Sequence, residues 1–120
     1  MRKLLSTPDD FARAVVDGDW IFVSGTTGFD YATMSIAEDI VAQTEQCFRN
    51  LAAALASAGG SLADVVRVTY IVPDAALFPR CWPVLRQHFG DVRPAATMIS
   101  AGLADRRMKI EIEVTARRRA

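Results

Sequence analysis

The segment SIAEDIVAQTEQCFRNLAAALASAGG, residues 35–60, decides the fold because it predicts one long amphipathic helix. Its apolar side chains recur at helical spacing and form one face, made of Ile40, Cys47, Phe48, Leu51 and Leu55. Ser35 and Glu38 match a capping box, which predicts that the helix begins at residue 35, and the glycine pair after residue 58 predicts its end. A helix with one apolar face must cover something, and a β-sheet is its natural partner.

Strand patterns flank this helix on both sides. Residues 14–16 and 21–24 predict a hairpin around an Asp-Gly turn. Residues 65–72 are rich in β-branched side chains and predict a strand with Val66, Val68, Tyr70 and Val72 on one face. Residues 77–89 predict a shorter second helix, and residues 95–101 and 108–115 predict two more strands. We therefore expect an α+β fold in which two helices pack on one face of a mixed sheet. Its uncovered face favours oligomerisation.

Length and charge limit the classes of function. The 120 residues predict a single domain over residues 1–120. Fourteen basic side chains balance fourteen acidic ones, so no field of one sign would gather nucleic acid or an anionic membrane. The Arg117-Arg118-Arg119 run is interpreted as a solvated tail. Without a signal peptide pattern or a long apolar run, the expected location is cytoplasmic.

The cysteines and the histidine of the sequence give little support for a metal site or a catalytic nucleophile. Cys47 and Cys81 lack a metal-type spacing, and His88 is the only histidine, so we expect no metal site. Cys47 falls on the apolar face of the long helix and is expected in the core, whereas Cys81 is left open. His88 is expected to be a surface or half-buried residue rather than a catalytic one.

Two features leave a structural and a functional interpretation open. Glu111 and Glu113 alternate with apolar residues of the last predicted strand, so they either form a solvated face or place one carboxylate in a pocket between subunits. The segment SGTTG, residues 24–28, is either an ordinary turn at a strand end or a turn whose amides bind an anion.

Four pieces of the chain follow one another in a specific order. They are VSG after the DGD hairpin, the stretch from residue 39 to residue 74 with its Gln43 and Asn50, the segment FGDVRPAAT, and the closing KIEIEVTA. Taken in this order, they resemble the RidA/YjgF family of small trimeric proteins. The resemblance spans residues 11–116. It implies a chorismate mutase-like fold, a homotrimer, and small-molecule sites in clefts between subunits. It also implies hydrolysis of enamines and imines such as 2-aminoacrylate, with no metal or organic cofactor.

The resemblance also assigns candidate site residues. Glu111 stands where family members have the glutamate that holds or activates water, and Gly25 stands at the glycine bordering the cleft. Phe11 replaces a frequent tyrosine, and Trp82 replaces a frequent asparagine. Ala96 stands where the family has an arginine that grips the substrate carboxylate with two hydrogen bonds. Loss of that arginine predicts weak binding of 2-aminoacrylate.

Three functions follow from these residues. The preferred one is a divergent deaminase-like hydrolase whose substrate is uncharged or larger than 2-aminoacrylate, with Glu111 as the catalytic carboxyl. The alternative is a trimer that binds a metabolite without chemistry. Ribonuclease activity is disfavoured, because the chain has neither net positive charge nor a basic aromatic platform. The side chain of Arg93 is expected to point away from the ligand cleft. Arg67, Arg106 or Arg107 remain as candidates to replace the arginine that is missing at position 96.

Overall fold

The computed structural model describes residues 2–6 and 12–119 and has one main sheet of six strands. The strands lie in the order β1-β2-β3-β8-β6-β7. Only the β6–β7 pair is parallel, and the other neighbours are antiparallel, so the sheet is mixed as predicted. The strands are β1 (Arg2–Ser6), β2 (Ala12–Asp17), β3 (Trp20–Thr27), β6 (Val65–Ile71), β7 (Ala95–Ile99) and β8 (Glu111–Arg117).

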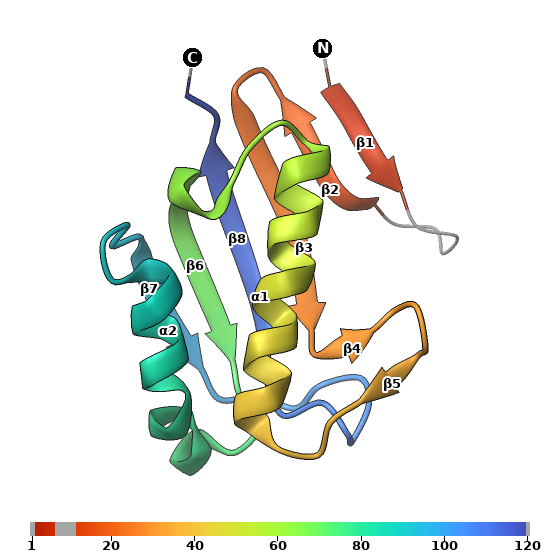
Figure 1. Ribbon diagram of the computed structural model, residues 1–120, viewed down its shortest axis with the longest axis vertical. Coiled ribbons are helices and arrows are strands. Elements are labelled where there is room, and N and C mark those ends of the chain that lie inside the picture. Colours follow the sequence, from red (N-terminus) through yellow and green to blue (C-terminus); the bar gives the residue numbers. More distant parts are fainter. Residues whose placement is uncertain (1, 7–11, 120) are drawn as a thin grey trace.

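Two α-helices cover one face of this sheet, as Figure 1 shows. The long helix α1 (Ile40–Ser57) crosses the middle strands, and α2 (Trp82–Phe89) lies in front of β7. Short 3₁₀ segments, η1 (Leu62–Asp64) and η2 (Ala75–Cys81), lead into β6 and α2. A small hairpin of β4 (Phe29–Asp30) and β5 (Ser35–Ile36) joins β3 to α1. The predicted architecture of a mixed sheet with two helices on one face is confirmed.

The predicted start of the long helix is wrong by five residues. Ser35 pairs with Asp30 in the small hairpin, so its backbone is extended and it cannot cap a helix. Asp39 caps α1 instead, because its carboxylate accepts a hydrogen bond of 3.1 Å from the amide of Ala42. The predicted end is confirmed, since Gly59 adopts a left-handed backbone with φ of +84° directly after the helix.

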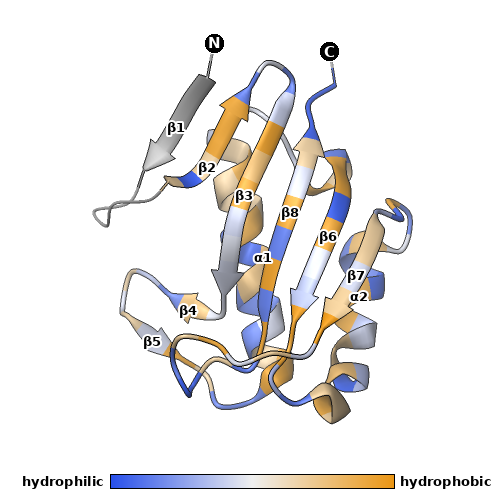
Figure 2. Ribbon diagram, turned by 180° about the vertical axis from the view of Figure 1, so that it is seen from behind, coloured by the Kyte–Doolittle hydropathy of each residue, from blue (hydrophilic) through white to orange (hydrophobic). Residues whose placement is uncertain are grey.

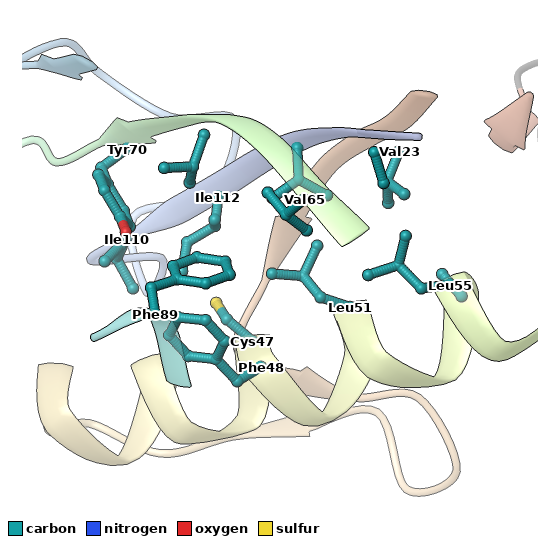
Figure 3. Packing of buried hydrophobic residues seen from close by; sticks show 14 of the residues in the cluster. Val23, Cys47, Phe48, Leu51, Leu55, Val65, Tyr70, Phe89, Ile110 and Ile112 are labelled. Carbon is teal, nitrogen blue, oxygen red and sulfur yellow. The ribbon is translucent and has the colours of Figure 1, made fainter. Parts of the chain in front are cut away.

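The core lies between α1 and the sheet, as seen in Figure 3. Phe48, Leu51 and Leu55 of α1 point towards Val23, Val65 and Ile112 on three adjacent strands. Phe89 of α2 meets Phe48 edge to face, with ring centroids 5.2 Å apart. Burial of these side chains stabilises the helix on the sheet far more than its intrinsic propensity does.

A bulge in β6 corrects one predicted face. Val65 pairs with Ala116 and Arg67 pairs with Thr115, so β6 has one residue more than β8 at this point. The extra residue, Val66, is pushed outward and is 39% exposed, whereas Val65 is buried. Val68, Tyr70 and Val72 share the buried face as expected.

No helix of the described residues covers the opposite face of the sheet, and Figure 2 shows this face with apolar residues along β2 and β3. Trp20 and Phe22 of β3 are 42% and 46% exposed there. Below we call this surface the open face. Among the described residues, no helix combines the length and the apolar character that crossing a bilayer requires.

The C-terminal arginines are more ordered than a solvated tail. Arg118 donates to the carbonyl oxygens of Gly18 and Ala58, which ties the last residues to the β2–β3 turn and to the end of α1. The guanidinium of Arg117 lies 5.7 Å from the ring centroid of Trp20. Arg117 and Arg119 are both exposed, and Arg119 makes a long contact of 3.8 Å with Asp64.

Candidate functional site

Glu111 and Gly25 lie against each other on the open face. Glu111 begins β8, and its carboxyl group folds over the backbone of Gly25 in the neighbouring strand β3. A β-carbon built on Gly25 would come 2.6 Å from Glu111 Cδ, so any other residue would displace the carboxyl group. The glycine is needed here for close approach and not for its own backbone conformation. Two of the site residues expected from the sequence are therefore neighbours.

A bulge in β3 creates this close approach. Val23 pairs with Val114 and Thr26 pairs with Ile112, so Ser24 and Gly25 together face one residue of β8. The Thr26 hydroxyl donates a hydrogen bond of 2.9 Å to the Ser24 carbonyl oxygen, which supports the kink. Both interpretations of the SGTTG segment as a turn are thus wrong, because most of it continues the strand.

The surroundings of Glu111 favour its protonated form. Burial raises the pKa of Glu111, and the nearby Glu113 carboxylate raises it further. Among the described residues, the ion pairs are Arg107 with Asp105 and Arg119 with Asp64, so none of them engages Glu111. The half-buried carboxyl is therefore not part of a surface ion pair on the described chain. A carboxyl of this kind can exchange a proton closer to neutral pH than an ordinary glutamate.

Gln43 and Asn50 of α1 hold the segments that carry Glu111 and Gly25. The buried Gln43 amide donates to the carbonyl oxygens of Ala37 and Arg107 at 2.7 and 2.8 Å, and it accepts a bond of 2.8 Å from the Lys109 amide. Lys109 lies two residues before Glu111, so this clamp fixes the entry to β8.

The Asn50 amide fixes the exit from β3. Its Nδ2 atom donates to the carbonyl oxygens of Thr27 and Phe29 at 2.9 and 2.8 Å. Gly28, between these residues, packs so closely on Gln43 that a β-carbon there would lie 2.7 Å from the Gln43 Cα atom. Gln43 and Asn50, which are part of the family resemblance, therefore position the site from the helix side of the sheet.

Ala96 is not close to Glu111 within one chain. Glu111 pairs with Ile71, and Ile71 pairs with Ile99, which is three residues beyond Ala96 along the edge strand β7. Two strand spacings and three residues each correspond to roughly 10 Å. Ala96 also pairs with the buried Val68, so it shares the helix side of the sheet, whereas Glu111 faces the other side.

The remaining substrate-binding candidates do not join Glu111 either. Trp82 is the first residue of α2, on the helix side, and is 48% exposed. Phe11 lies outside the described residues. The structure thus brings together Gly25 and Glu111, and it places Ala96 and Trp82 on the other side of the sheet.

The arginines considered as substitutes for the missing one have other surroundings. Arg107 binds Asp105 with two hydrogen bonds of 3.1 and 2.7 Å and lies over the Phe29 ring. Arg67 is level with Thr115, four residues along β8 from Glu111. Arg93 has a positive φ of 52°, although a residue before a proline favours an extended backbone, and its side chain is exposed, as is that of Arg106.

Arg13 lies near the site, and the sequence did not predict it as a site residue. Arg13 of β2 lies beside the β3 bulge, and its carbonyl oxygen accepts a hydrogen bond of 3.0 Å from the Ser24 hydroxyl. Its guanidinium carbon lies 4.1 Å from the ring centroid of Tyr31. No sequence motif marks this pair, because the two residues meet only through the pairing of β2 with β3 and the position of the small hairpin.

The surroundings of the two thiols and of the histidine indicate packing roles for these side chains. Cys47 and Cys81 are both fully buried, and burial is the main cause that raises the pKa of each. Both remain neutral thiols at neutral pH and are poor nucleophiles. His88 is half-buried and stacks on Phe48 with centroids 4.2 Å apart, and burial lowers its pKa. These findings agree with the expected roles of Cys47 and His88.

Comparisons with known proteins extend over nearly the whole chain. A family model described as Endoribonuclease L-PSP matches residues 1–118. A RutC family protein from Pyrococcus horikoshii is 33% identical over 107 residues, which cover 88% of this chain and 85% of that protein. A protein from Salmonella typhimurium named 2-iminobutanoate/2-iminopropanoate deaminase is 30% identical over 112 residues, covering 91% and 88%.

A solved structure agrees with the fold. The crystal structure of a member of the YjgF/YER057c/UK114 family from Mycobacterium tuberculosis superposes with a TM-score of 0.87 at 33% identity. The superposition covers 98% of this chain and 99% of that one. Sequence motifs, sheet topology and these matches agree, and the chain belongs to the RidA/YjgF family.

Proposed function

We propose that the protein is a deaminase-like hydrolase that converts a small imine or enamine into a carbonyl compound and ammonia. The observation that carries the proposal is the Glu111 carboxyl group, which is half-buried on Gly25, has a raised pKa, and forms no ion pair with a described residue. The name of the 30% identical Salmonella relative supports the reaction class.

The chemistry needs a group that moves protons. Water adds to the imine carbon, and the carboxylate of Glu111 takes the proton that the water loses. The protonated carboxyl then gives this proton to the nitrogen, which yields a carbinolamine. The carboxylate next takes the proton of the carbinolamine hydroxyl and passes it to the amino group, so the carbon–nitrogen bond breaks and ammonia leaves as the carbonyl forms. A raised pKa suits both steps, because the carboxyl is a better base than an ordinary glutamate and is still acidic enough to donate.

The substrate is proposed to differ from 2-aminoacrylate. The methyl group of Ala96 offers no hydrogen bond to a carboxylate, whereas the resemblance places a guanidinium at this position. Loss of a charge-assisted bidentate contact weakens binding by about 2 kcal/mol or more. The exposed ring of Trp82 favours an apolar or larger group near Ala96 if both face the same ligand.

A homotrimer with clefts between subunits is part of the proposal. Ala96 and Trp82 lie on the helix side of the sheet and Glu111 on the open face, so a ligand that meets all three requires two copies of the chain. The exposed Trp20 and Phe22 side chains of the open face favour burial against another copy. Sedimentation equilibrium tests this assembly, and a monomer mass would refute it.

A trimer that binds a metabolite without reaction is the second candidate. It is favoured by Ala96, because a ligand held without the family's arginine need not be oriented for hydrolysis. Ribonuclease activity, which the name of the family model suggests, remains disfavoured by the zero net charge.

Ammonia release separates the two candidates. Imines are generated in the assay from a panel of primary amines by a flavin amine oxidase and, for comparison, from α-amino acids by an amino acid oxidase. Their hydrolysis is followed with the wild type, Glu111→Gln and Glu113→Gln. We expect the wild type to accelerate hydrolysis of at least one imine, Glu111→Gln to lose at least tenfold of that rate, and Glu113→Gln to lose less. Equal rates for the wild type and Glu111→Gln would leave the binding trimer as the better account.

A further inference from the structure

The open face places a cation and two carboxyl groups on opposite sides of the β3 bulge. Ala14 pairs with Val23, so the preceding Arg13 lies beside Ser24 on β2. Ala14 is buried against the helices, and alternation therefore puts Arg13 on the open face. On the other side, Glu111 covers Gly25, and Glu113 faces the bulge from β8.

The Arg13 side chain packs on the ring of Tyr31. Its guanidinium carbon lies 4.1 Å from the centre of the Tyr31 ring, within the range of a cation–π contact. Tyr31 itself directly follows β4. The Asn50 side chain donates a hydrogen bond to the Phe29 carbonyl oxygen of this strand. Such stacking leaves the edge N–H groups of the guanidinium free to bind an anion.

The distance across the bulge suits a short linear molecule. β2 and β8 are separated by two strand spacings, which amount to roughly 10 Å between backbones. A hollow of about 260 Å³ adjoins the bulge, and its lining includes Val15, Phe22, Ser24 and Glu113. The lining of the hollow contains neither Arg13 nor Glu111, so the hollow lies beside the path between the charges and offers an apolar wall to the methylene groups of a linear ligand.

We propose that Arg13, held by Tyr31, binds the anionic end of the substrate while Glu111 meets its nitrogen end across the Gly25 bulge. The substrate class is then a straight-chain imine that carries an anionic group several bonds away from its nitrogen, and the corresponding amine is an unreactive mimic of it. This inference rests on the proposed function only in taking Glu111 as the reacting end. In this arrangement the cation for an anionic ligand comes from β2 instead of β7.

Binding of ω-amino acids tests the inference without any turnover. Glycine, β-alanine, 4-aminobutyrate, 5-aminopentanoate and 6-aminohexanoate are titrated into the wild type by calorimetry. We expect the affinity to peak at an intermediate chain length, and we expect the corresponding amino alcohols, which lack the anion, to bind at least tenfold more weakly. Absence of binding across the series, or no dependence on chain length, would overturn the inference.

Variants then assign the effect to Arg13. Arg13→Gln should lower the best affinity at least tenfold and remove the preference for length. Tyr31→Ala should weaken binding severalfold and Tyr31→Phe should preserve it, because the ring and not the hydroxyl holds the guanidinium. Arg67→Gln, which removes an open-face arginine level with Thr115, is the matched control and should leave the affinity unchanged.

The outcomes separate this inference from the proposed hydrolase. If Arg13→Gln and Arg67→Gln change the affinity equally, or if neither changes it, the inference fails whatever the hydrolysis assay gives. If Glu111→Gln abolishes hydrolysis while Arg13→Gln binds like the wild type, only the hydrolase survives. If binding depends on Arg13 while no imine is hydrolysed, the anion site survives and the hydrolase fails. Circular dichroism checks that each variant is folded.

Discussion

The carboxyl group of Glu111 occupies the space that a side chain at position 25 would fill, so Gly25 and Glu111 form one structural unit across β3 and β8. The β3 bulge brings the backbone towards the carboxyl group, and the absent β-carbon admits it. This contact keeps Glu111 half-buried on an otherwise exposed face. Burial in turn raises the pKa of Glu111, so the geometry and the acid–base property have one cause.

Gly25→Ala should separate the pair. The new methyl group would lie 2.6 Å from Glu111 Cδ, so the flexible glutamate side chain must swing towards solvent. We expect the pKa of Glu111 to fall towards its ordinary value, as measured by carbon-detected NMR titration, with a loss of stability of about 1 kcal/mol. Gly102→Ala is the control, because a β-carbon there meets nothing within 4 Å. An unchanged Glu111 pKa in Gly25→Ala would show that the contact does not set it.

The pH dependence of stability should carry the signature of Glu111. Its pKa is raised in the folded protein, so between the ordinary value of 4.5 and the raised value the folded state binds more protons than the unfolded state. The free energy of unfolding therefore decreases as the pH rises through this window. Glu111→Gln should remove this decrease in urea unfolding measured from pH 4 to pH 7. Parallel pH profiles of wild type and Glu111→Gln would contradict the raised pKa.

Glu113→Gln should lower the pKa of Glu111. The Glu113 carboxylate disfavours a second negative charge two residues away on the same face, and the amide removes this repulsion. The NMR titration used for Gly25→Ala measures the shift. Because burial is the larger cause, the pKa should remain above its ordinary value in this variant.

Gln43→Ala should destabilise the fold strongly. The substitution leaves the carbonyl oxygens of Ala37 and Arg107 and the amide of Lys109 without their buried partner. We expect a loss of about 3 kcal/mol in the free energy of unfolding, from urea denaturation. Gln87→Ala, at an exposed position of α2, should change it by less than about 0.5 kcal/mol. A loss below about 1 kcal/mol for Gln43→Ala would mean that the clamp contributes little.

Arg118→Ala should loosen the C-terminal end. Arg118 donates to Ala58 at the end of α1 and to Gly18 in the β2–β3 turn, and a cation at a helix C-terminus is favourable. We expect a loss of about 1–2 kcal/mol in thermal or urea unfolding. Arg119→Ala removes only an exposed contact of 3.8 Å and should cost about 0.5 kcal/mol or less. Equal effects of the two substitutions would contradict the assigned role of Arg118.

The sequence predicted the elements better than their boundaries. The helical spacing of apolar residues in α1 and the glycine that ends the helix are both local sequence features, so the sequence predicted them. The start of α1 was misplaced because Ser35 pairs with Asp30 in the small hairpin, and this strand pairing overrides the capping pattern. Val66 was assigned to the wrong face for a similar reason, since a bulge depends on the register with β8.

The candidate site was partly predictable. The resemblance pointed to Gly25 and Glu111, and these residues are neighbours. It could not reveal that Ala96 and Trp82 lie on the other side of the sheet, because a motif carries no information about which face or which copy of the chain a residue joins. Arg13 and Tyr31 were missed because only the folded chain brings them together.

The hydrolysis of 2-aminoacrylate by Ala96→Arg tests the central claim most directly. If Glu111 and position 96 of a neighbouring copy form one family-type cleft that lacks only its carboxylate clamp, the wild type hydrolyses 2-aminoacrylate poorly. Ala96→Arg should then gain at least tenfold in rate, and the double variant Ala96→Arg with Glu111→Gln should lose that gain. Efficient turnover by the wild type, or a gain in Ala96→Arg that persists without Glu111, would contradict the account.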